Sequence, residues 1–102
     1  IKEVDLSPKL LKDLLFEIGF RKTNLFMLLA TVYDNKPYIS CYISKELSEK
    51  KVLKAGEIVK KLAHLIEGAG GGQSFYASAG GKNINGVTKV IIKARDLIIN
   101  WK

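Results

Sequence analysis

The chain has 102 residues, which is enough for one domain with a single hydrophobic core. Seventeen Lys and Arg residues against ten Asp and Glu give a formal charge of +7, which favours polyanionic partners. One cysteine and one histidine exclude an internal disulfide and a structural metal site built from those ligands. We therefore expect a cytoplasmic domain with no membrane partner, since neither a membrane-length apolar run nor a signal peptide is seen.

The N-terminal half predicts a strand, a helix and a hairpin. Alternation over residues 3–6 predicts a short strand, and Ser7-Pro8 is typical of a helix start. The helix is expected from about Pro8 to Ile18 and ends at Gly19, with five apolar side chains on one face: Leu10, Leu11, Leu14, Leu15 and Ile18.

Two strands are expected next. Residues 25–33 are apolar without interruption, which predicts a central strand buried on both faces. After turn residues at 34–37, residues 38–44 alternate, with Ile39, Cys41 and Ile43 directed inward. These two strands form a predicted hairpin.

The C-terminal half predicts two more helices around a glycine-rich segment. Residues 45–53 are charged and predict a loop, and a helix follows over about Ala55 to Glu67. A short edge strand is expected at Ser74–Ser78, and a last helix runs from about Val87 to Asn100. Three apolar residues fall outside its inward face, which predicts either burial of the helix on more than one side or a contact surface with the rest of a longer protein: Ile92, Ile99 and Trp101.

The order β-α-β-β-α-(β)-α predicts an α/β fold with one mixed β-sheet and helices packed on it. We expect one globular domain over residues 1–102. The sequence begins at Ile1 directly on a strand pattern, so we also expect it to be a fragment of a longer protein.

Residues 68–82 hold six of the nine glycines, including the triplet Gly70–Gly72. The segment fails the Walker A pattern because Asn83 follows Gly81-Lys82, and it fails G-x-G-x-x-G because Gln73 or Phe75 stands where the last glycine should be. A glycine-rich loop of exposed N–H groups beside lysines predicts binding of phosphates. The alternative is a helix C-cap at Gly68 followed by a flexible connection.

Basic residues concentrate in the same half: residues 51–102 have nine Lys and Arg against three acids, and residues 1–50 have eight against seven. Phosphate contacts by such side chains are independent of nucleic-acid sequence and sensitive to salt. Phe75 and Tyr76 would either stack on an unpaired base or pack as strand residues; packing is favoured for Phe75. The candidate nucleic-acid-binding residues are Lys54, Lys60, Lys61, His64, Gly70, Gly71, Gly72, Gln73, Ser74, Tyr76, Gly80, Gly81, Lys82 and Lys89.

No catalytic residues are predicted. His64 would need a nucleophile, but neither Ser74 nor Ser78 lies in a G-x-S-x-G elbow, so a solvated or RNA-facing histidine is favoured. Cys41 lies on the inward side of its strand and is interpreted as a small buried apolar residue.

The triplet Gly70–Gly72 with Ala79-Gly80-Gly81-Lys82, preceded by Lys54-Ala55-Gly56-Glu57-Ile58-Val59-Lys60, resembles the DHH-associated family of C-terminal domains in alanyl-tRNA synthetases. The same family is attached to DHH-type phosphoesterases and exonucleases. The family positions carried over are the triplet, Ala79, Gly80 and Lys82, with Ala55-Gly56 supporting the second helix. Phosphoesterase relatives have a histidine where Gln73 stands, which favours the synthetase branch. Synthetase relatives commonly have a basic residue, Pro and Asp there, so the segment from Gln73 departs from both patterns.

The resemblance implies a tRNA-binding C-terminal module of an alanine–tRNA ligase, without cofactor or catalysis of its own. It would contact the outer corner of the alanine tRNA and bridge the aminoacylation and editing domains. The longer protein would use ATP, magnesium and zinc. Two alternatives stay open: the substrate-binding domain of a DHH-type phosphoesterase or exonuclease, which grips single strands or small nucleotides, and a dimerisation or interaction domain. Some relatives use this region for dimer contacts, so a homodimer is compatible with the resemblance.

Overall fold

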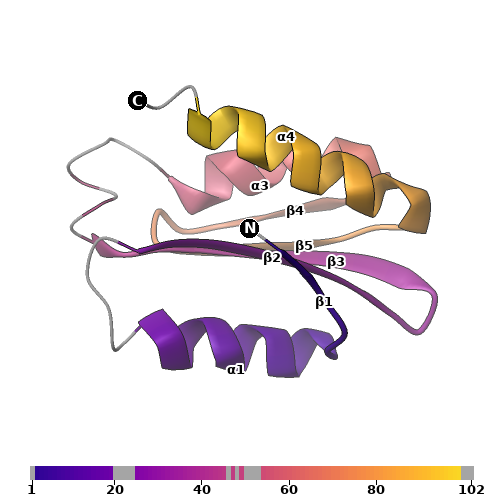
Figure 1. Ribbon diagram of the computed structural model, residues 1–102, viewed down its shortest axis with the longest axis horizontal. Coiled ribbons are helices and arrows are strands. Elements are labelled where there is room, and N and C mark those ends of the chain that lie inside the picture. Colours follow the sequence, from indigo (N-terminus) through magenta and orange to yellow (C-terminus); the bar gives the residue numbers. More distant parts are fainter. Residues whose placement is uncertain (1, 20–24, 46, 48, 50–53, 100–102) are drawn as a thin grey trace.

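A mixed five-stranded sheet forms the centre of the computed structural model, which describes residues 2–19, 25–45, 47, 49 and 54–99 (Figure 1). The strand order is β1-β2-β3-β5-β4, with β1 parallel to β2 and the other neighbours antiparallel. The strands are β1 (Lys2–Val4), β2 (Phe26–Tyr33), β3 (Lys36–Ile43), β4 (Ala69–Gly72) and β5 (Tyr76–Gly80). The predicted α/β fold with one mixed sheet is confirmed.

Helices cover both faces of this sheet (Figure 1). On one face α1 (Pro8–Gly19) packs against β2 and β3. On the other, α3 (Ala55–Ala63) lies over β3, β4 and β5, and α4 (Val87–Ile99) lies over β1 and β2. Two 3₁₀ helices, His64–Ile66 and Ile84–Gly86, link β4 and α4 to their neighbours. The strands β4 and β5 are therefore covered along their length by α3, and on the other face α1 reaches β5 at Tyr76, whose ring contacts Phe16.

The strand β2 is buried on both faces, as its unbroken apolar sequence predicts. Leu28 and Ala30 pack in the main core under α3 and α4, and Leu29 packs with α1. In β3 the alternating residues join the main core as predicted: Ile39, Cys41 and Ile43. The hairpin turns at Asp34 and Asn35, whose φ angles of 53° and 59° match a two-residue type I′ turn.

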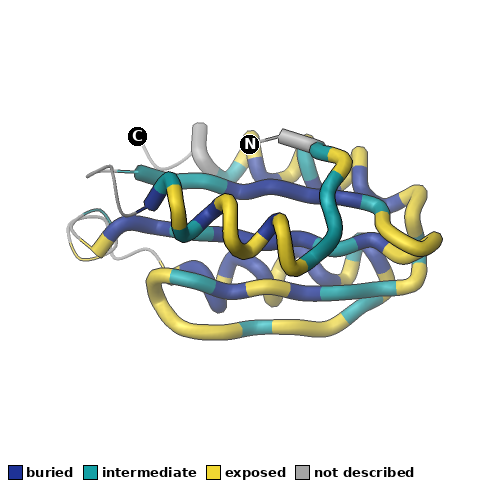
Figure 2. The backbone as a smooth tube through the Cα atoms, turned by 90° about the horizontal axis from the view of Figure 1, so that it is seen from below, coloured by how far each residue is buried: buried dark blue, intermediate teal, exposed yellow. Residues whose placement is uncertain are grey.

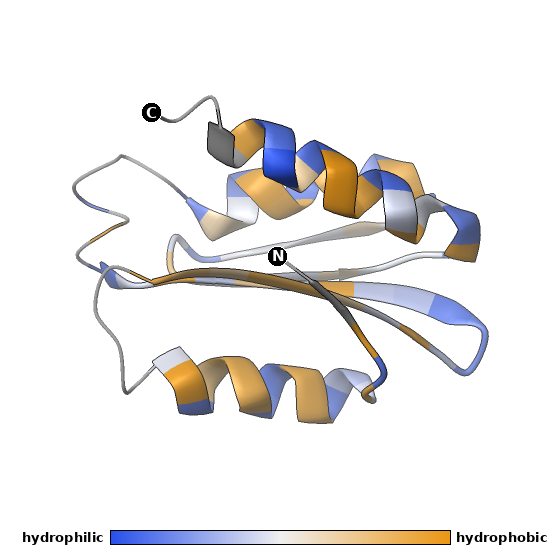
Figure 3. Cartoon of the chain, in the orientation of Figure 1, coloured by the Kyte–Doolittle hydropathy of each residue, from blue (hydrophilic) through white to orange (hydrophobic). Residues whose placement is uncertain are grey.

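The helix α1 begins where the sequence predicts, with the Ser7 hydroxyl accepting the Leu10 N–H at 3.3 Å. Its buried face is narrower than expected. Leu11 and Leu15 are buried, whereas Leu10 is 54% exposed and Leu14 is 36% exposed. One sheet face below the helix leaves no second surface to cover these two leucines, and Figure 3 shows their helix as apolar over much of its length.

Two predictions about irregular segments are wrong. The triplet Gly70–Gly72 is not a loop but lies in β4, the edge strand. The short strand expected at Ser74–Ser78 is Tyr76–Gly80 and lies between β3 and β4 instead of at the edge. Small side chains give β4 no alternation that a sequence could reveal, and its pairing with β5 makes it a strand.

The described part of the predicted loop 45–53 also differs, because Lys45, Leu47 and Glu49 are helical. In α4 the inward face is formed by Val87, Val90 and Ala94, which are buried, and Ile92, predicted to lie outside that face, is 55% exposed. The side chain of Ile99 and all of Trp101 lie outside the described residues.

Candidate nucleic-acid interface

The open edge of β4 is the first feature of the candidate site. The Gln73 N–H donates to the Tyr76 carbonyl oxygen at 2.8 Å, so Gln73–Tyr76 is a hydrogen-bonded pair of the β4–β5 ladder. Bonded and non-bonded pairs alternate in an antiparallel ladder, which makes Gly71–Ser78 bonded and directs the N–H groups of Gly70 and Gly72 to the open edge. Figure 2 shows this edge as largely exposed. Exposed N–H groups, which the sequence predicted for a loop, are therefore present at Gly70 and Gly72, but they belong to a strand.

The three glycines of the triplet are not equivalent. A Cβ at Gly70 would collide with the Ser78 carbonyl oxygen and the Ala79 side chain. A Cβ at Gly71 would meet only the Lys60 Cε, at 3.4 Å, which is ordinary contact. Hence Gly70 is required by the packing of the hairpin, whereas Gly71 has room for a methyl group.

A second glycine contact sets the height of α3 above β4. A Cβ at Gly56 would lie 2.8 Å from the carbonyl oxygen of Gly72, so the first turn of α3 rests on the strand backbone. The residue closing the following 3₁₀ helix is Glu67, with φ 51°, and not the expected Gly68. Gly68 is instead needed because a Cβ there would collide with the Gly80 carbonyl oxygen.

The N-terminus of α3 is occupied by the protein itself. The Ala55 and Gly56 N–H groups donate to the carbonyl oxygens of Ser74 and Gln73, at 2.9 and 3.1 Å. These two amides would otherwise suit an anion. Lys54, Gln73 and Ser74 are exposed together at this end of β4, where their backbone supports the helix.

Basic side chains lie beside the first residues of β4, Ala69 and Gly70. A cleft of about 240 Å³ lies between them and is lined by Lys60, Ala63, His64, Gly68, Ala69 and Gly70. Lys60 and His64 are exposed, and both lie on the side of α3 next to β4. The predicted convergence of these two residues with the glycine segment is present in the structure.

At the start of β4 a second groove of about 520 Å³ is lined by Lys82, another of the predicted basic residues. Lys82 lines it with Gly80, Gly81, Glu67 and Lys36, and Lys36 is not among the residues predicted from the sequence. Ala69 and Gly68 line both this groove and the cleft beside Lys60. Lys60 of α3 and Lys82, which follows β5, thus border the same end of β4.

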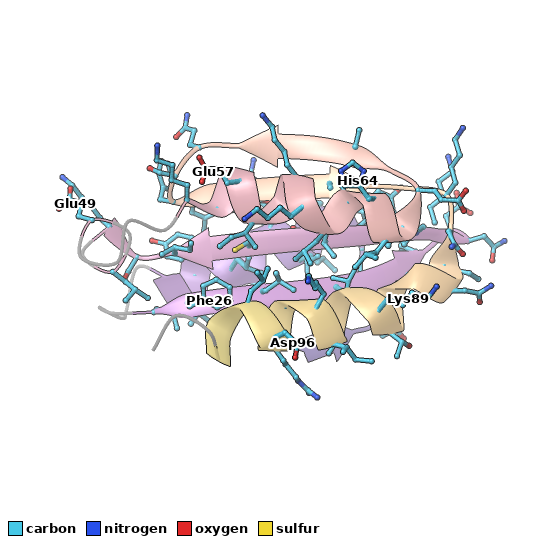
Figure 4. The ribbon with its side chains drawn as sticks, turned by 90° about the horizontal axis from the view of Figure 1, so that it is seen from above. Phe26, Glu49, Glu57, His64, Lys89 and Asp96 are labelled. Atoms are coloured by element: carbon cyan, nitrogen blue, oxygen red, sulfur yellow. The ribbon has the colours of Figure 1, made fainter. Side chains whose placement is uncertain are left out.

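Two predicted lysines lie elsewhere. Lys61 is exposed on α3 but does not line the cleft. Lys89 belongs to α4. In Figure 4, α3 lies between α4 and β4, and His64 lies on the side that faces β4. The structure therefore does not bring Lys89 to the β4 edge.

Packing was predicted for Phe75 and left open against stacking for Tyr76, and the structure has Tyr76 as the packed ring. Phe75 is 39% exposed, although packing was expected. The Tyr76 ring is half-buried against Phe16, with ring centroids 4.8 Å apart, and the Lys12 Nζ lies 5.6 Å from its centroid. This contact engages the Tyr76 ring with α1.

A family model described as DHHA1 domain matches residues 2–101, which is nearly the whole chain. The chain belongs to the DHHA1 domain family. Its relatives include proteins named alanine–tRNA ligase from Flavobacterium psychrophilum and Christiangramia forsetii, each 46% identical over 97 residues that cover 95% of this chain. The aligned residues are 11% of each relative, so this DHHA1 domain spans about a tenth of their length.

The fold of this DHHA1 domain is also known from a solved structure, the C-Ala domain from Aquifex aeolicus alanyl-tRNA synthetase. The TM-score is 0.80 at 22% sequence identity, covering 94% of this chain and 85% of that one. The predicted resemblance to the C-terminal domains of alanyl-tRNA synthetases is confirmed.

The histidine and the serines considered for catalysis lie apart in this DHHA1 domain. Ser78 lines a groove on the α1 side of the sheet, whereas His64 lines the cleft on the α3 side, so these two do not pair. Burial raises the pKa of the Cys41 thiol to about 12, which fits its interpretation as an apolar core residue. Among the described residues no three His, Cys, Asp or Glu side chains form a metal-binding group, and no helix is long and apolar enough to cross a membrane.

Proposed function

We propose that this DHHA1 domain is the tRNA-binding C-terminal module of an alanine–tRNA ligase, and that it holds the sugar–phosphate backbone along β4. The observation that carries the proposal is the cleft in which Lys60 of α3 and His64 of the following 3₁₀ helix face the small residues of the edge strand. Small side chains let a phosphate approach the outward N–H groups of Gly70 and Gly72, and the lysines supply the charge.

Two further observations support this proposal. The neighbouring groove adds Lys36 and Lys82 to the same edge, with Glu67 the only acid among its lining residues. The relatives that align with this chain are named alanine–tRNA ligase. The proposed interface keeps Lys54, Lys60, His64, Lys82 and the glycine strand, and leaves out Lys89 because α4 lies beyond α3.

The proposal assigns the remaining chemistry to the longer protein. The ATP, magnesium and zinc of an alanine–tRNA ligase would serve aminoacylation and editing domains outside this chain. By contacting the outer corner of the alanine tRNA, this domain would hold one tRNA for both of those domains in the cytoplasm. Its own residues would bind and not react.

A salt titration of tRNA binding tests the interface. Each phosphate contact contributes about one unit to the slope of log K against log salt, so the double variant Lys60→Ala, Lys82→Ala should reduce the slope by about two. Lys93→Ala, an exposed lysine of α4, is the matched control and should leave the slope unchanged. An unchanged slope in the double variant would place the tRNA elsewhere.

A competition experiment separates this function from the phosphoesterase alternative. Unlabelled tRNA should displace labelled tRNA at much lower concentration than dinucleotides or short single strands. If the short nucleotides compete as well as tRNA, the domain is the substrate-binding half of a phosphoesterase. Binding that does not depend on salt would support a dimerisation or interaction domain instead.

A further inference from the structure

A further groove lies on the face of the sheet opposite α3. Its volume is about 580 Å³, within the range of small-molecule sites. It lies beside α1, which packs on β2 and β3 and contacts β5 through Phe16 and Tyr76, so that parts of β3, β4 and β5 stay uncovered on this side (Figure 2). The polar and aromatic residues that line it are Lys9, Lys12, Tyr38, Ser40, Tyr76 and Ser78.

The groove adjoins the proposed phosphate-binding edge at one residue. Ala69, the first residue of β4, lines this groove, the groove beside Lys82 and the cleft beside Lys60. The charged residues lining the three are five lysines and one glutamate: Lys9, Lys12, Lys36, Lys60, Lys82 and Glu67. An RNA sugar–phosphate backbone that follows β4 towards Ala69 would therefore reach a positively charged groove.

Tyr38 is held where the two larger grooves join. It pairs with Gly80 across the β3–β5 ladder, and a Cβ at Gly80 would lie 3.2 Å from the Tyr38 ring. The absence of a side chain at Gly80 thus lets the half-buried ring rest on the strand, lining both grooves. This aromatic ring, unlike that of Tyr76, has no ring contact with Phe16 among the described residues.

Polar and charged side chains line the same groove as Tyr38. Lys12 Nζ lies 5.6 Å from the centroid of the Tyr76 ring, which positions the ammonium group at the wall of the groove. Lys9 lies one turn earlier on α1. On the floor, Ser40 is 4% exposed and its Oγ lies 3.5 Å from the Tyr76 hydroxyl, and Ser78 is exposed.

We propose that this groove is a second site on the domain, which takes one unpaired nucleotide of the bound RNA, with its base stacked on Tyr38 and its phosphates held by Lys9 and Lys12. The inference rests on the proposed function, since the RNA backbone enters the groove from β4. Stacking on an aromatic ring together with lysine contacts is how proteins hold unpaired nucleotides. The charge of the groove favours this occupant over an apolar peptide.

The test compares two six-nucleotide strands of uridine, one intact and one with a single abasic position. Both carry the same phosphates, so their difference in affinity reports the base. Wild-type protein should bind the intact strand at least about fivefold more tightly, which is the lower end of a stacking contribution. Tyr38→Leu, which retains contact over Gly80, should abolish that difference, and Tyr38→Phe should restore it.

A second measurement needs no variant. The ring proton resonances of Tyr38 should shift upfield on addition of the intact strand and not on addition of the abasic strand. Equal affinity of the wild-type protein for both strands, or an unshifted Tyr38 ring, would overturn the proposal. Equal competition by polyglutamate of the same charge would also overturn it, since the groove would then accept any polyanion.

The outcome is distinguishable from failure of the proposed function. If Lys9→Ala, Lys12→Ala leaves tRNA binding unchanged while Lys60→Ala, Lys82→Ala weakens it, the groove is not a nucleotide site and the β4 interface stands. If neither double variant changes tRNA binding, both proposals fail.

Discussion

Replacing single glycines of β4 separates the glycines needed for folding from those left free for a ligand. The paired variants are Gly70→Ala and Gly71→Ala, which add the same methyl group to neighbouring positions of one strand. At Gly70 the new Cβ would collide with the Ser78 carbonyl oxygen and the Ala79 side chain. At Gly71 it would meet only the end of the Lys60 side chain at 3.4 Å.

The expected energies follow from these contacts. Replacing a strand glycine by alanine removes unfolded-chain entropy and stabilises by roughly 0.5–1 kcal/mol where the methyl group fits. Forcing a methyl group against a packed backbone costs about 1–3 kcal/mol. Gly71→Ala should therefore be neutral or stabilising by up to about 1 kcal/mol, whereas Gly70→Ala should lose about 1–2 kcal/mol.

Urea unfolding measures both variants under one condition. The midpoint should fall for Gly70→Ala and stay or rise for Gly71→Ala, with an unchanged slope m in each. The folded Gly71→Val variant should then bind tRNA more weakly, since a branched side chain beside Lys60 keeps a phosphate away from the strand. Equal destabilisation of the two alanine variants would refute the assignment of Gly71 as the position with room.

Three further predictions concern the packing. Gly56→Ala should destabilise the domain by about 1 kcal/mol in urea unfolding. The new methyl group would lie 2.8 Å from the Gly72 carbonyl oxygen, and the cost of this clash exceeds the gain in helix propensity of about 1 kcal/mol. A stabilised variant would show that α3 can move off β4. In α1, Leu11→Ala should cost about 2–5 kcal/mol and Leu10→Ala less than about 1 kcal/mol, as measured by urea midpoints, and similar losses would contradict the one-sided burial of the helix. Burial raises the pKa of Cys41 from 9.0 to about 12, so its neutral thiol contributes stability that is complete below pH 9 and is lost as pH rises towards 12. Cys41→Ala should therefore lose less unfolding free energy than the wild-type protein over that pH range. Identical pH profiles of the two proteins would argue against a buried neutral thiol.

The regular parts of the fold could be predicted because side-chain periodicity fixes them. The unbroken apolar run of β2, the alternation of β3 and the apolar stripe of α3 each permit one pattern of burial, and the structure has it. Leu10 and Leu14 could not be placed from periodicity alone, since the stripe of α1 is wider than the sheet face that covers it.

The edge strand could not be predicted for a different reason. Gly70, Gly71 and Gly72 have no side chains to alternate, so their strand conformation depends on the ladder with β5 and on the contact with Gly56. The apolar periodicity of the helix predicted over about Ala55 to Glu67 places Lys60 on its outer face, but only the tertiary fold shows that Lys60 faces β4. Lys36 and Tyr38 were missed because they belong to the site only through the pairing of β3 with β5.

The most direct test of the proposed interface follows individual backbone amides by NMR while tRNA is added. The N–H resonances of Gly70 and Gly72, which point to the open edge, should shift and become slower to exchange, and added salt should reverse both changes. Amides on the exposed side of α4, such as that of Lys93, should not change. Unperturbed Gly70 and Gly72 amides at saturating tRNA would contradict binding along β4.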